Sequence, residues 1–215
     1  MPPEAIRWIR PRDAWLLDRA FQQPLDLVAR LIEGVSLYLE AAAQAEDAAD
    51  LFGRLEACGQ LVRLDPAAEP AMYRCATVSE AELMSLRRIE NVVRRGRVLH
   101  IGSDRIALEE GSIPTSAGQV HVDCSAAGLR AAPGRPVFAA GRITLQQIRA
   151  CQPVFSAALA GYVEASRYDD AGKNRLCPPN PYPDAAVDWI PVTFLTQIPQ
   201  AAAPRRRRPP EIRAC

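Results

Sequence analysis

QVHVDCSAAGL, residues Gln119 to Leu129, combines the pattern of a strand with that of a tight turn. Apolar and polar residues alternate through 119–124, which is typical of a half-buried strand, and only small residues follow at 125–128. A glycine takes positive φ without steric cost, so another backbone or a ligand can approach such a turn closely. The turn therefore lies against a helix or against a cofactor, and this stretch alone favours a helix.

Length and charge favour a globular protein without a general affinity for polyanions. The chain has 215 residues, enough for one domain with a sizeable core or one and a half smaller ones. Lys and Arg number 26 against 25 Asp and Glu, and the net charge of +1 predicts no general attraction to nucleic acid or membranes. No apolar run approaches the roughly 20 residues that span a bilayer, and no signal-peptide pattern opens the sequence. We therefore expect a cytoplasmic location.

The six cysteines do not form a metal-binding pattern. They include no CxxC pair and no histidine at ligand spacing, so we expect no metal site.

The first half of the chain shows strand and helix signals in quick succession. We expect a strand at 6–9, a helix at 24–43, a helix at 47–58 closed by Gly59, and a short strand at 61–64. The helix at 24–43 has an apolar stripe that we expect to pack inward, formed by Leu25, Val28, Ile32, Val35 and Leu39.

The second half contains two capping boxes and a meander. Ser79 and Glu82 start a helix that we expect to end at Gly96, and Thr144 and Gln147 start another before Pro153. Between them, a β-meander is expected from runs at 98–101, 105–109 and 119–124. A Pro/Arg-rich tail, 191–215, is expected to be disordered.

Arg10 and Arg12 follow the first expected strand. In doubly wound sheets ligands bind beyond the carboxyl ends of strands, and an arginine at the end of the second strand holds the 2′-phosphate of NADP. A guanidinium suits a phosphate because it donates two parallel hydrogen bonds. The alternative is that both arginines are solvated or paired with Asp13 and Asp18.

The other reactive side chains have simpler explanations. His100 and His121 are expected to be half-buried structural residues, and Cys124 to pack as a small apolar residue. The arginines at 205–208 have no aromatic residues among them and are expected to be solvated. We therefore assign no catalytic residue.

Four stretches together resemble bacterial FAD- and NAD(P)-dependent oxidoreductases with two dinucleotide-binding domains, related to flavin monooxygenases and pyridine nucleotide reductases. They are IRWIRPRDAWLLDR, the meander, HVDCSAAGL and GRITLQQIRACQPVFSAALAGYVEA, and the resemblance covers residues 4 to about 190. It implies an α/β fold in which 1–124 is a partial Rossmann-like NAD(P)-binding domain, including the three-stranded meander 97–124, and 125–190 is the C-terminal segment of an FAD-binding domain. It also implies that Arg10 and Arg12 contact NADP and that FAD is approached by a turn made of Ser125, Ala126, Ala127 and Gly128. Ala127 departs from the threonine common there.

The sequence contains no G-x-G-x-x-G, whereas the family carries one such loop for each dinucleotide, upstream of the matching region. The resemblance therefore implies the C-terminal part of a flavoprotein that transfers hydride from nicotinamide to flavin, inactive without its other half. The alternative is a non-catalytic module that binds a partner protein or nucleic acid through helix 24–43 and the basic tail. Of these partners, nucleic acid is the less expected and a membrane is not expected.

Overall fold

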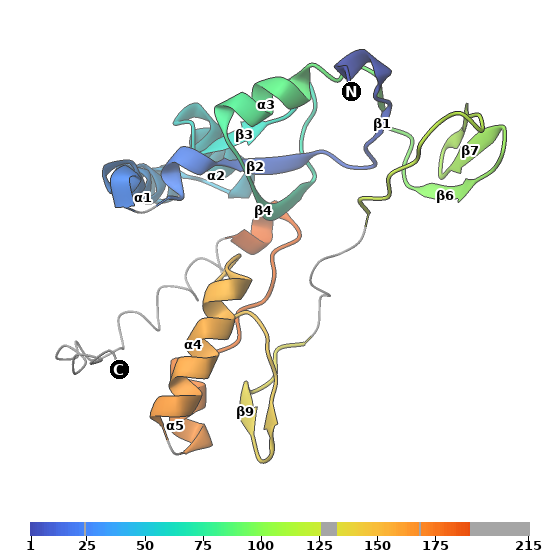
Figure 1. Ribbon diagram of the computed structural model, residues 1–215. Helices are drawn as coiled ribbons and strands as arrows, with labels where there is room; N and C mark the ends of the chain where they lie inside the picture. The colour runs from blue at the N-terminus through green and yellow to red at the C-terminus, as the bar shows by residue number, and fades with distance from the viewer. Residues whose placement is uncertain (24, 126–132, 168, 190–215) are drawn as a thin grey trace. The chain divides into compact units, whose positions relative to one another are not determined.

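A computed structural model of the chain describes residues 1–23, 25–125, 133–167 and 169–189, and shows a mixed α/β protein with several small sheets (Figure 1). It consists of two compact units. Unit 1 comprises Met1–Arg130 and Pro183–Trp189, and unit 2 comprises Ala131–Tyr182 and Ile190–Cys215. Each unit has its own hydrophobic core.

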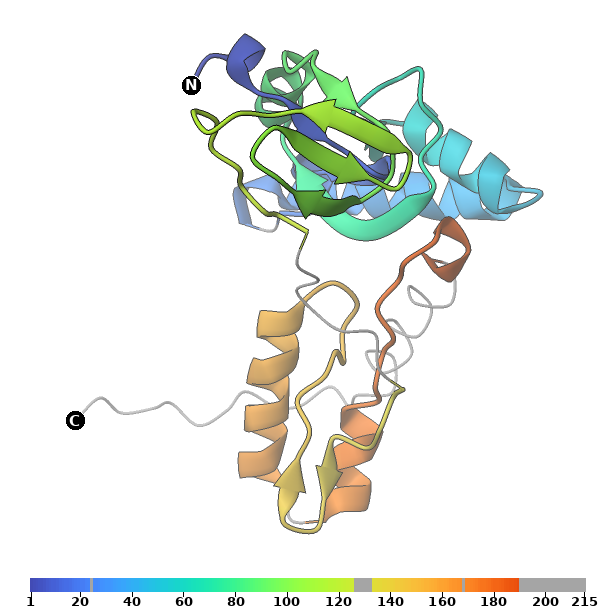
Figure 2. The same cartoon turned by 90° about the vertical axis from the view of Figure 1, so that its right-hand side faces the viewer.

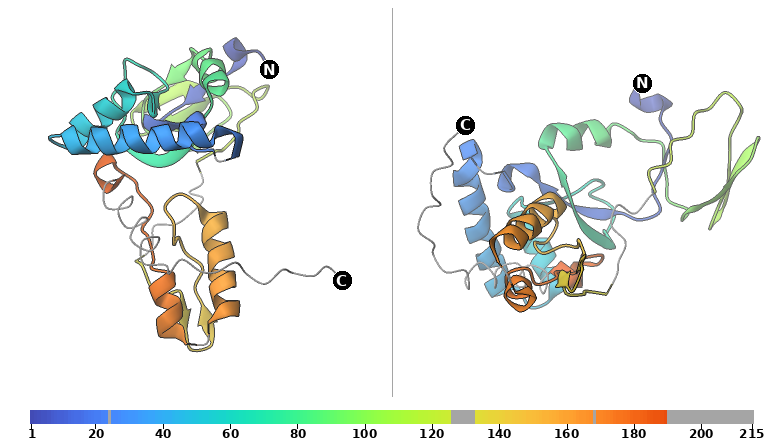
Figure 3. Two further views of the ribbon diagram at one scale, coloured as in Figure 1. Left: turned by 90° about the vertical axis from the view of Figure 1, so that its left-hand side faces the viewer. Right: turned by 60° about the horizontal axis from the view of Figure 1, so that its bottom comes forward.

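The main sheet of unit 1 has β2 in the centre. β2 (Ala14–Asp18) pairs with β3 (Leu61–Arg63) in antiparallel and with β4 (Met72–Val78) in parallel orientation. Between β2 and β3 the chain forms α1 (Val28–Gln44) and α2 (Ala48–Ala57), seen in Figure 3, and α3 (Glu80–Arg87) follows β4. Short 3-10 helices lie at Pro3–Ala5, Arg19–Phe21, Leu25–Leu27 and Ala186–Asp188.

An aromatic cluster forms the core between this sheet and α1 and α2. Phe52 of α2 is 2% exposed and makes edge contacts with three rings. The centroid distances are 5.5 Å to Trp15, 5.6 Å to Tyr73 and 6.0 Å to Trp189. These geometries are the favourable ones for aromatic pairs, so α2 is held firmly on the sheet.

α2 confirms the prediction for 47–58. The Asp47 side chain accepts a hydrogen bond from the Asp50 N–H, which satisfies a free donor at the helix start. Leu51, Phe52 and Leu55 are buried, and Gly59 takes φ +79° just beyond the helix end.

The predicted helix forms, although α1 begins at Val28 rather than at residue 24, but the prediction that its apolar stripe packs inward is wrong for the four members whose burial is described. Val28, Ile32, Val35 and Leu39 are 49%, 62%, 52% and 58% exposed. The helix packs through small residues instead, with Gly34 and Ala41 buried. Gly34 is decisive because a Cβ there would lie 2.9 Å from a ring carbon of Phe21, and its carbonyl accepts a 2.7 Å hydrogen bond from Gln60.

The capping box of α3 is confirmed. The Ser79 hydroxyl accepts from the Glu82 N–H, and the Glu82 carboxylate accepts from the Ser79 N–H at 2.7 Å and from Arg19 at 2.8 Å. These hydrogen bonds, those from Ser79 first and that from Arg19 after them, lower the pKa of Glu82 to about 2. The expectation that the helix runs to Gly96 is wrong, because it ends at Arg87 and the chain continues into a strand.

A second part of unit 1 combines a parallel strand pair with a meander. β1 (Trp8–Ile9) pairs in parallel with β5 (Val92–Val93). The antiparallel meander is β6 (Val98–Ile101), β7 (Arg105–Leu108) and β8 (Gly111–Pro114), drawn in green in Figure 2. Ile9 and Val93 cover the buried side chains of the meander, Ile106, Leu108 and Ile113.

The third meander strand is not the predicted one. Leu108 pairs with Gly111, so β7 and β8 are joined by a two-residue turn, and Gly111 adopts φ +90°. Residues 119–125 lie in no strand, and Val120 and Val122 are 83% and 77% exposed. The Gly111–Pro114 segment pairs with β7 because the two-residue turn places it directly beside that strand, whereas 119–124 has no neighbouring strand among the described residues.

Unit 2 is built from a short hairpin and two helices. They are β9 (Phe138–Ala139), β10 (Arg142–Ile143), α4 (Pro153–Ser166) and α5 (Asp170–Leu176). Its core consists of Val137, Phe138, Ile148, Ala160, Val163 and Cys177. The predicted capping box at Thr144 and Gln147 does not form, because α4 starts at Pro153, a residue suited to the first helical turn.

Two helical leucines test the burial of α1 and α2. We expect Leu51→Ala to lower the free energy of unfolding by about 3 kcal/mol, because it opens a cavity in the core. Leu39→Ala, the matched exposed control, is expected to cost less than about 0.5 kcal/mol. Urea unfolding followed by tryptophan fluorescence measures this, since Trp8, Trp15 and Trp189 all lie in unit 1. Equal losses would contradict the orientation of α1.

The Glu82 cap gives a pH dependence of defined sign. The pKa of Glu82 falls from 4.5 to about 2 on folding, so the carboxylate stabilises the fold fully above about pH 5 and loses that effect as the pH falls through 4.5 toward 2. We expect the stability difference between the wild type and Glu82→Gln to shrink over that range. Unfolding curves recorded between pH 7 and pH 3 measure it, and a constant difference would count against the assignment.

Candidate functional site

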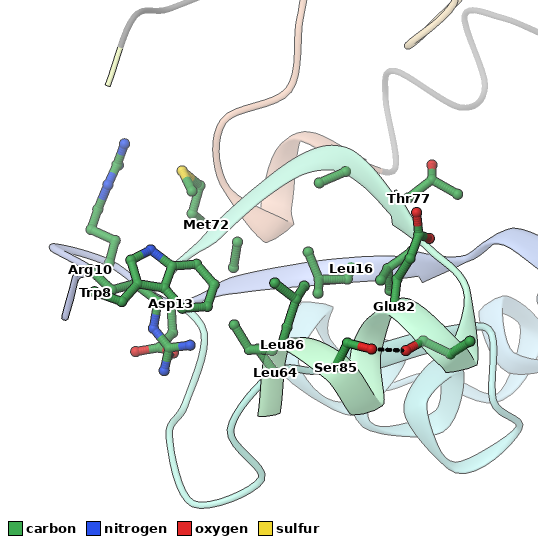
Figure 4. Close-up of a pocket in the computed structure, with 15 residues that line it drawn as sticks. Trp8, Arg10, Asp13, Leu16, Leu64, Met72, Thr77, Glu82, Ser85 and Leu86 are labelled. Carbon is green, nitrogen blue, oxygen red and sulfur yellow. Dashed lines mark hydrogen bonds and ion pairs between the residues drawn. The ribbon is translucent and has the colours of Figure 1, made fainter. Parts of the chain in front are cut away.

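A pocket of about 770 Å³ lies in unit 1, and β2, β4, α3 and the segment leading from β1 to β2 line it (Figure 4). This volume is within the range of small-molecule sites, roughly 300–1,000 Å³. Side chains alternate across a strand, so Leu16 faces the pocket while its neighbour Trp15 faces the aromatic core. The apolar lining residues are Trp8, Ala14, Leu16, Leu64, Met72, Ala76, Val78, Ala81 and Leu86.

Polar side chains gather at two ends of the pocket. Figure 4 shows Trp8, Arg10 and Asp13 together at one end and Thr77, Glu82 and Ser85 at the other. At the end with Thr77, Glu82 and Ser85, the Ser85 hydroxyl is not free to donate to a ligand, because it donates a hydrogen bond to the Ala81 carbonyl at 2.8 Å. Glu82 is occupied by the helix cap and Arg19.

The turn between β1 and β2 positions both predicted arginines at this site. The Arg10 N–H donates to the Val93 carbonyl at 2.9 Å, which extends the parallel pairing of β1 with β5 by one bond. Pro11 has no N–H, so the ladder stops there and the chain turns into β2. Arg10 and Arg12 therefore lie beyond the carboxyl end of β1, as predicted, and both line the pocket.

Arg10 is buried and its charge is compensated. Its side chain is 9% exposed, and its Nη2 lies 2.7 Å from Asp13. Asp13 also pairs with Arg94 at 2.9 Å, and Arg94 contacts Asp65 at 2.5 Å. Burial lowers the pKa of Arg10 from its usual range, while Asp13 acts in the opposite direction, and the group stays charged. The predicted alternative of a pair with Asp13 is thus observed for Arg10.

Arg12 is the more accessible arginine. Its side chain is 37% exposed, and its ion pair with Asp184 is long, at 3.9 Å. Asp184 also binds Arg74 at 2.6 Å, so its charge is shared between two arginines. The charge of Arg12 is therefore the less compensated of the two and is open to an anion.

The other predicted contact, the turn at 125–128, is only partly within the described residues. The Ser125 N–H donates to the Asp123 carboxylate at 2.8 Å, and hydrogen bonds from Ser125 lower the pKa of Asp123. Ala126, Ala127 and Gly128 lie outside the described residues, as does the tail at 191–215.

Neither His100 nor His121 is among the described residues that line this pocket. His100 and His121 are exposed rather than half-buried, and His121 Nε2 lies 2.9 Å from the Thr115 hydroxyl. Across the described ranges, no group of three or more His, Cys, Asp and Glu side chains is placed to hold a metal ion. None of the helices in these ranges is long and apolar enough to cross a bilayer.

Sequence reasoning did not identify Trp8 or Arg94 as parts of the site. The Arg10 guanidinium carbon lies 5.3 Å from the centre of the Trp8 ring. The signal for Arg94 was its place directly after Val92 and Val93, an apolar pair too short to be recognised as a strand.

The chain is similar to uncharacterized mycobacterial proteins. It is 48% identical over 189 residues, 87% of its length, to Rv2000 and MT2056 of Mycobacterium tuberculosis and to Mb2023 of Mycobacterium bovis. The match spans 35% of the length of each of these relatives, about a third. No protein-family model matches the chain, and no solved structure matches it.

Proposed function

We propose that the chain is part of an FAD-dependent, NAD(P)H-linked oxidoreductase and that unit 1 holds the phosphate-bearing end of the nicotinamide dinucleotide. The observation that carries the proposal is the position of Arg12, beyond the carboxyl end of a parallel strand and beside an apolar pocket. Ligands of parallel α/β sheets bind at that end of the strands. An accessible guanidinium there suits the 2′-phosphate of NADP.

In this proposal β1 and β5 are neighbouring strands of a partial Rossmann-like sheet. Unit 2 then contains the C-terminal segment of an FAD-binding domain, and the turn at Ser125 to Gly128 leads toward FAD. The assignment of β1 and β5 and that of unit 2 rest on the resemblance of the sequence to two-domain flavoproteins. The proposed location of the protein is the cytoplasm.

The residues of the chain bind and orient rather than react. When bound, the nicotinamide supplies a hydride and the flavin accepts it. Arg12 donates hydrogen bonds to the phosphate. Leu16, Leu64 and Leu86 exclude water from the part of the dinucleotide that lies in the pocket. The pocket therefore contributes affinity and selects between NADP and NAD.

Arg12→Met tests the phosphate contact directly. We expect it to weaken binding of 2′,5′-ADP by about 10- to 100-fold, because a charge-assisted hydrogen bond is worth about 1.5–3 kcal/mol. Binding of 5′-ADP, which has no 2′-phosphate, should change less than about twofold. Isothermal titration calorimetry measures both affinities. The matched control is Arg105→Met, at a side chain that is 67% exposed and paired with its neighbour Asp104. Equal losses for the two ligands would reject the phosphate role.

A second candidate function is a protein interaction module, and the exposed stripe of α1 favours it. Val28, Ile32, Val35 and Leu39 are all about half exposed or more, and they recur at steps of three and four on one side of the helix. Continuous exposed apolar surface of this kind marks interaction sites. It favours a protein partner over nucleic acid.

Self-association is the direct test of that stripe. If α1 docks onto a second copy, Ile32→Asp combined with Leu39→Asp should raise the dimer dissociation constant at least about tenfold, because two apolar anchors become charged. Sedimentation velocity over a range of concentrations measures this. Met84→Asp, at an equally exposed position of α3, is the control. A wild-type chain that stays monomeric throughout removes this version of the candidate.

A further inference from the structure

β6 forms an open edge of the meander. The strand order is β6–β7–β8, and among the described residues β6 pairs with β7 alone (Figure 1). Every residue of β6 is exposed, and its apolar members Val98, Leu99 and Ile101 are 41%, 65% and 45% exposed. An edge strand presents backbone N–H and carbonyl groups that lack a partner strand, so β6 can accept a further strand.

The other edge of the meander, at β8, is closed. The Pro114 carbonyl accepts a hydrogen bond from Arg7 at 2.6 Å, and the Ser112 carbonyl accepts one from Arg95 at 3.4 Å. Pro114 also has no N–H to donate to a neighbouring strand. A strand that joins this sheet therefore pairs with β6 rather than with β8.

Residues 119–123 repeat the pattern of the strand that already pairs with β6. The sequence at 105–109 is Arg-Ile-Ala-Leu-Glu, and that at 119–123 is Gln-Val-His-Val-Asp. Both have apolar residues at the second and fourth positions and an acidic residue at the fifth. Because 119–123 lies in no strand, Val120 and Val122 are 83% and 77% exposed and lack the cover that a sheet gives such residues.

This segment fits the outer edge of β6 in the register that β7 uses on the inner edge. The two large apolar residues of β7 lie opposite Ile101 and Val98 in antiparallel orientation. The same register on the outer edge places Val120 beside Ile101 and Val122 beside Val98. Cross-strand apolar pairs of this kind stabilise a sheet, so the apolar face of the meander is extended by one strand.

The charges at the end of the two segments are complementary. Glu109, the acidic residue at the end of β7, donates its N–H to the Arg97 carbonyl at 3.1 Å. The matching register places Asp123, the acidic residue of the segment, beside Arg97. Within the described ranges neither of these two side chains forms an ion pair, and the Asp123 carboxylate accepts from the Ser125 N–H at 2.8 Å. The added strand therefore gives each of them a partner of opposite charge.

The segment of the same molecule is fastened away from β6. The Thr115 hydroxyl, directly after β8, lies 2.7 Å from Gln119 Oε1 and 2.9 Å from His121 Nε2. Neighbouring strands lie about 4.8 Å apart, so β8 and β6, with β7 between them, are separated by about 10 Å. The side chains of Val120 and Val122 stay exposed in this arrangement, which leaves them open to a second copy.

We propose that residues 119–124 of one molecule add to β6 of a second copy as a fourth, antiparallel strand of the meander. The exchange is reciprocal, so each molecule gives one strand and receives one, and the dimer is closed. This inference is independent of the proposed dinucleotide site and of the α1 stripe, because it uses none of their residues.

Two charge reversals test the pairing between copies. Arg97→Glu and Asp123→Arg each place like charges at both junctions of the dimer, so each alone should raise the dimer dissociation constant at least about tenfold. An equimolar mixture of the two variants again has opposite charges at both junctions. It should therefore form a mixed dimer with an affinity close to that of the wild type. Sedimentation velocity over a range of concentrations measures the wild type, both variants and the mixture.

Val122→Asp provides a second test that leaves the sheet itself unchanged, because Val122 lies in no strand. Placing a charge among the apolar side chains of the new pair should also raise the dissociation constant at least about tenfold. Met84→Asp, at a side chain of α3 that is 57% exposed, is the matched control and should leave the dimer intact.

The other outcomes each overturn the inference. A wild type that stays monomeric, or a dimer that Val122→Asp leaves intact, would do so. A dimer weakened only by Ile32→Asp combined with Leu39→Asp would assign self-association to the α1 stripe. Weakening by Arg97→Glu without any by Asp123→Arg would mean that β6 pairs with β6, and no recovery in the mixture would exclude pairing between copies.

Discussion

The carboxylate of Asp13 holds unit 1 together at the point where the chain passes from the β1–β5 pair to the β2–β3–β4 sheet. It accepts from Arg10, which follows β1, and from Arg94, which follows β5, and it stands directly before β2. Arg94 also reaches Asp65, just beyond β3. One nearly buried carboxylate thus joins the β1–β5 pair to the β2–β3–β4 sheet. Removing one partner of a buried pair typically costs about 3–5 kcal/mol, because the other charge is left in place without water.

This arrangement also sets the electrostatics of the pocket. Arg12 lies between Arg10 and Asp13 in the sequence, so the same ion pairs that link the two sheets fix the backbone that carries it. Because Asp13 neutralises one arginine and not the other, two neighbouring cations have different environments.

Some local signals were read correctly from the sequence, but the capping box at Thr144 and Gln147, the end of α3 and the tertiary choices were not. The α2 cap at Asp47 and the α3 capping box depend on residues three positions apart, so the sequence contains all the information. The burial of α1 depends on Phe21 and Gln60, which select Gly34 rather than the larger apolar side chains. The third strand was misplaced because a two-residue turn at 109–110 competes with a longer loop.

The candidate site shows the same division. The sequence placed Arg10 and Arg12 at the end of a strand, and both line the pocket. It did not distinguish them, because the second partner of Asp13 is Arg94, 81 positions away along the chain. The accessible arginine is identified only when the parallel pairing of β1 with β5 brings those residues together.

The exposed side chains of Val120 and Val122 influence how readily the protein self-associates at high concentration. They lie on a segment that is in no strand and that no described strand pairs with, and exposed apolar segments of this kind are sites where molecules associate. A net charge of +1 provides almost no long-range repulsion near neutral pH. This segment is therefore, together with the exposed stripe of α1, an apolar surface through which molecules can associate, and moving the solution pH away from neutrality keeps the molecules apart.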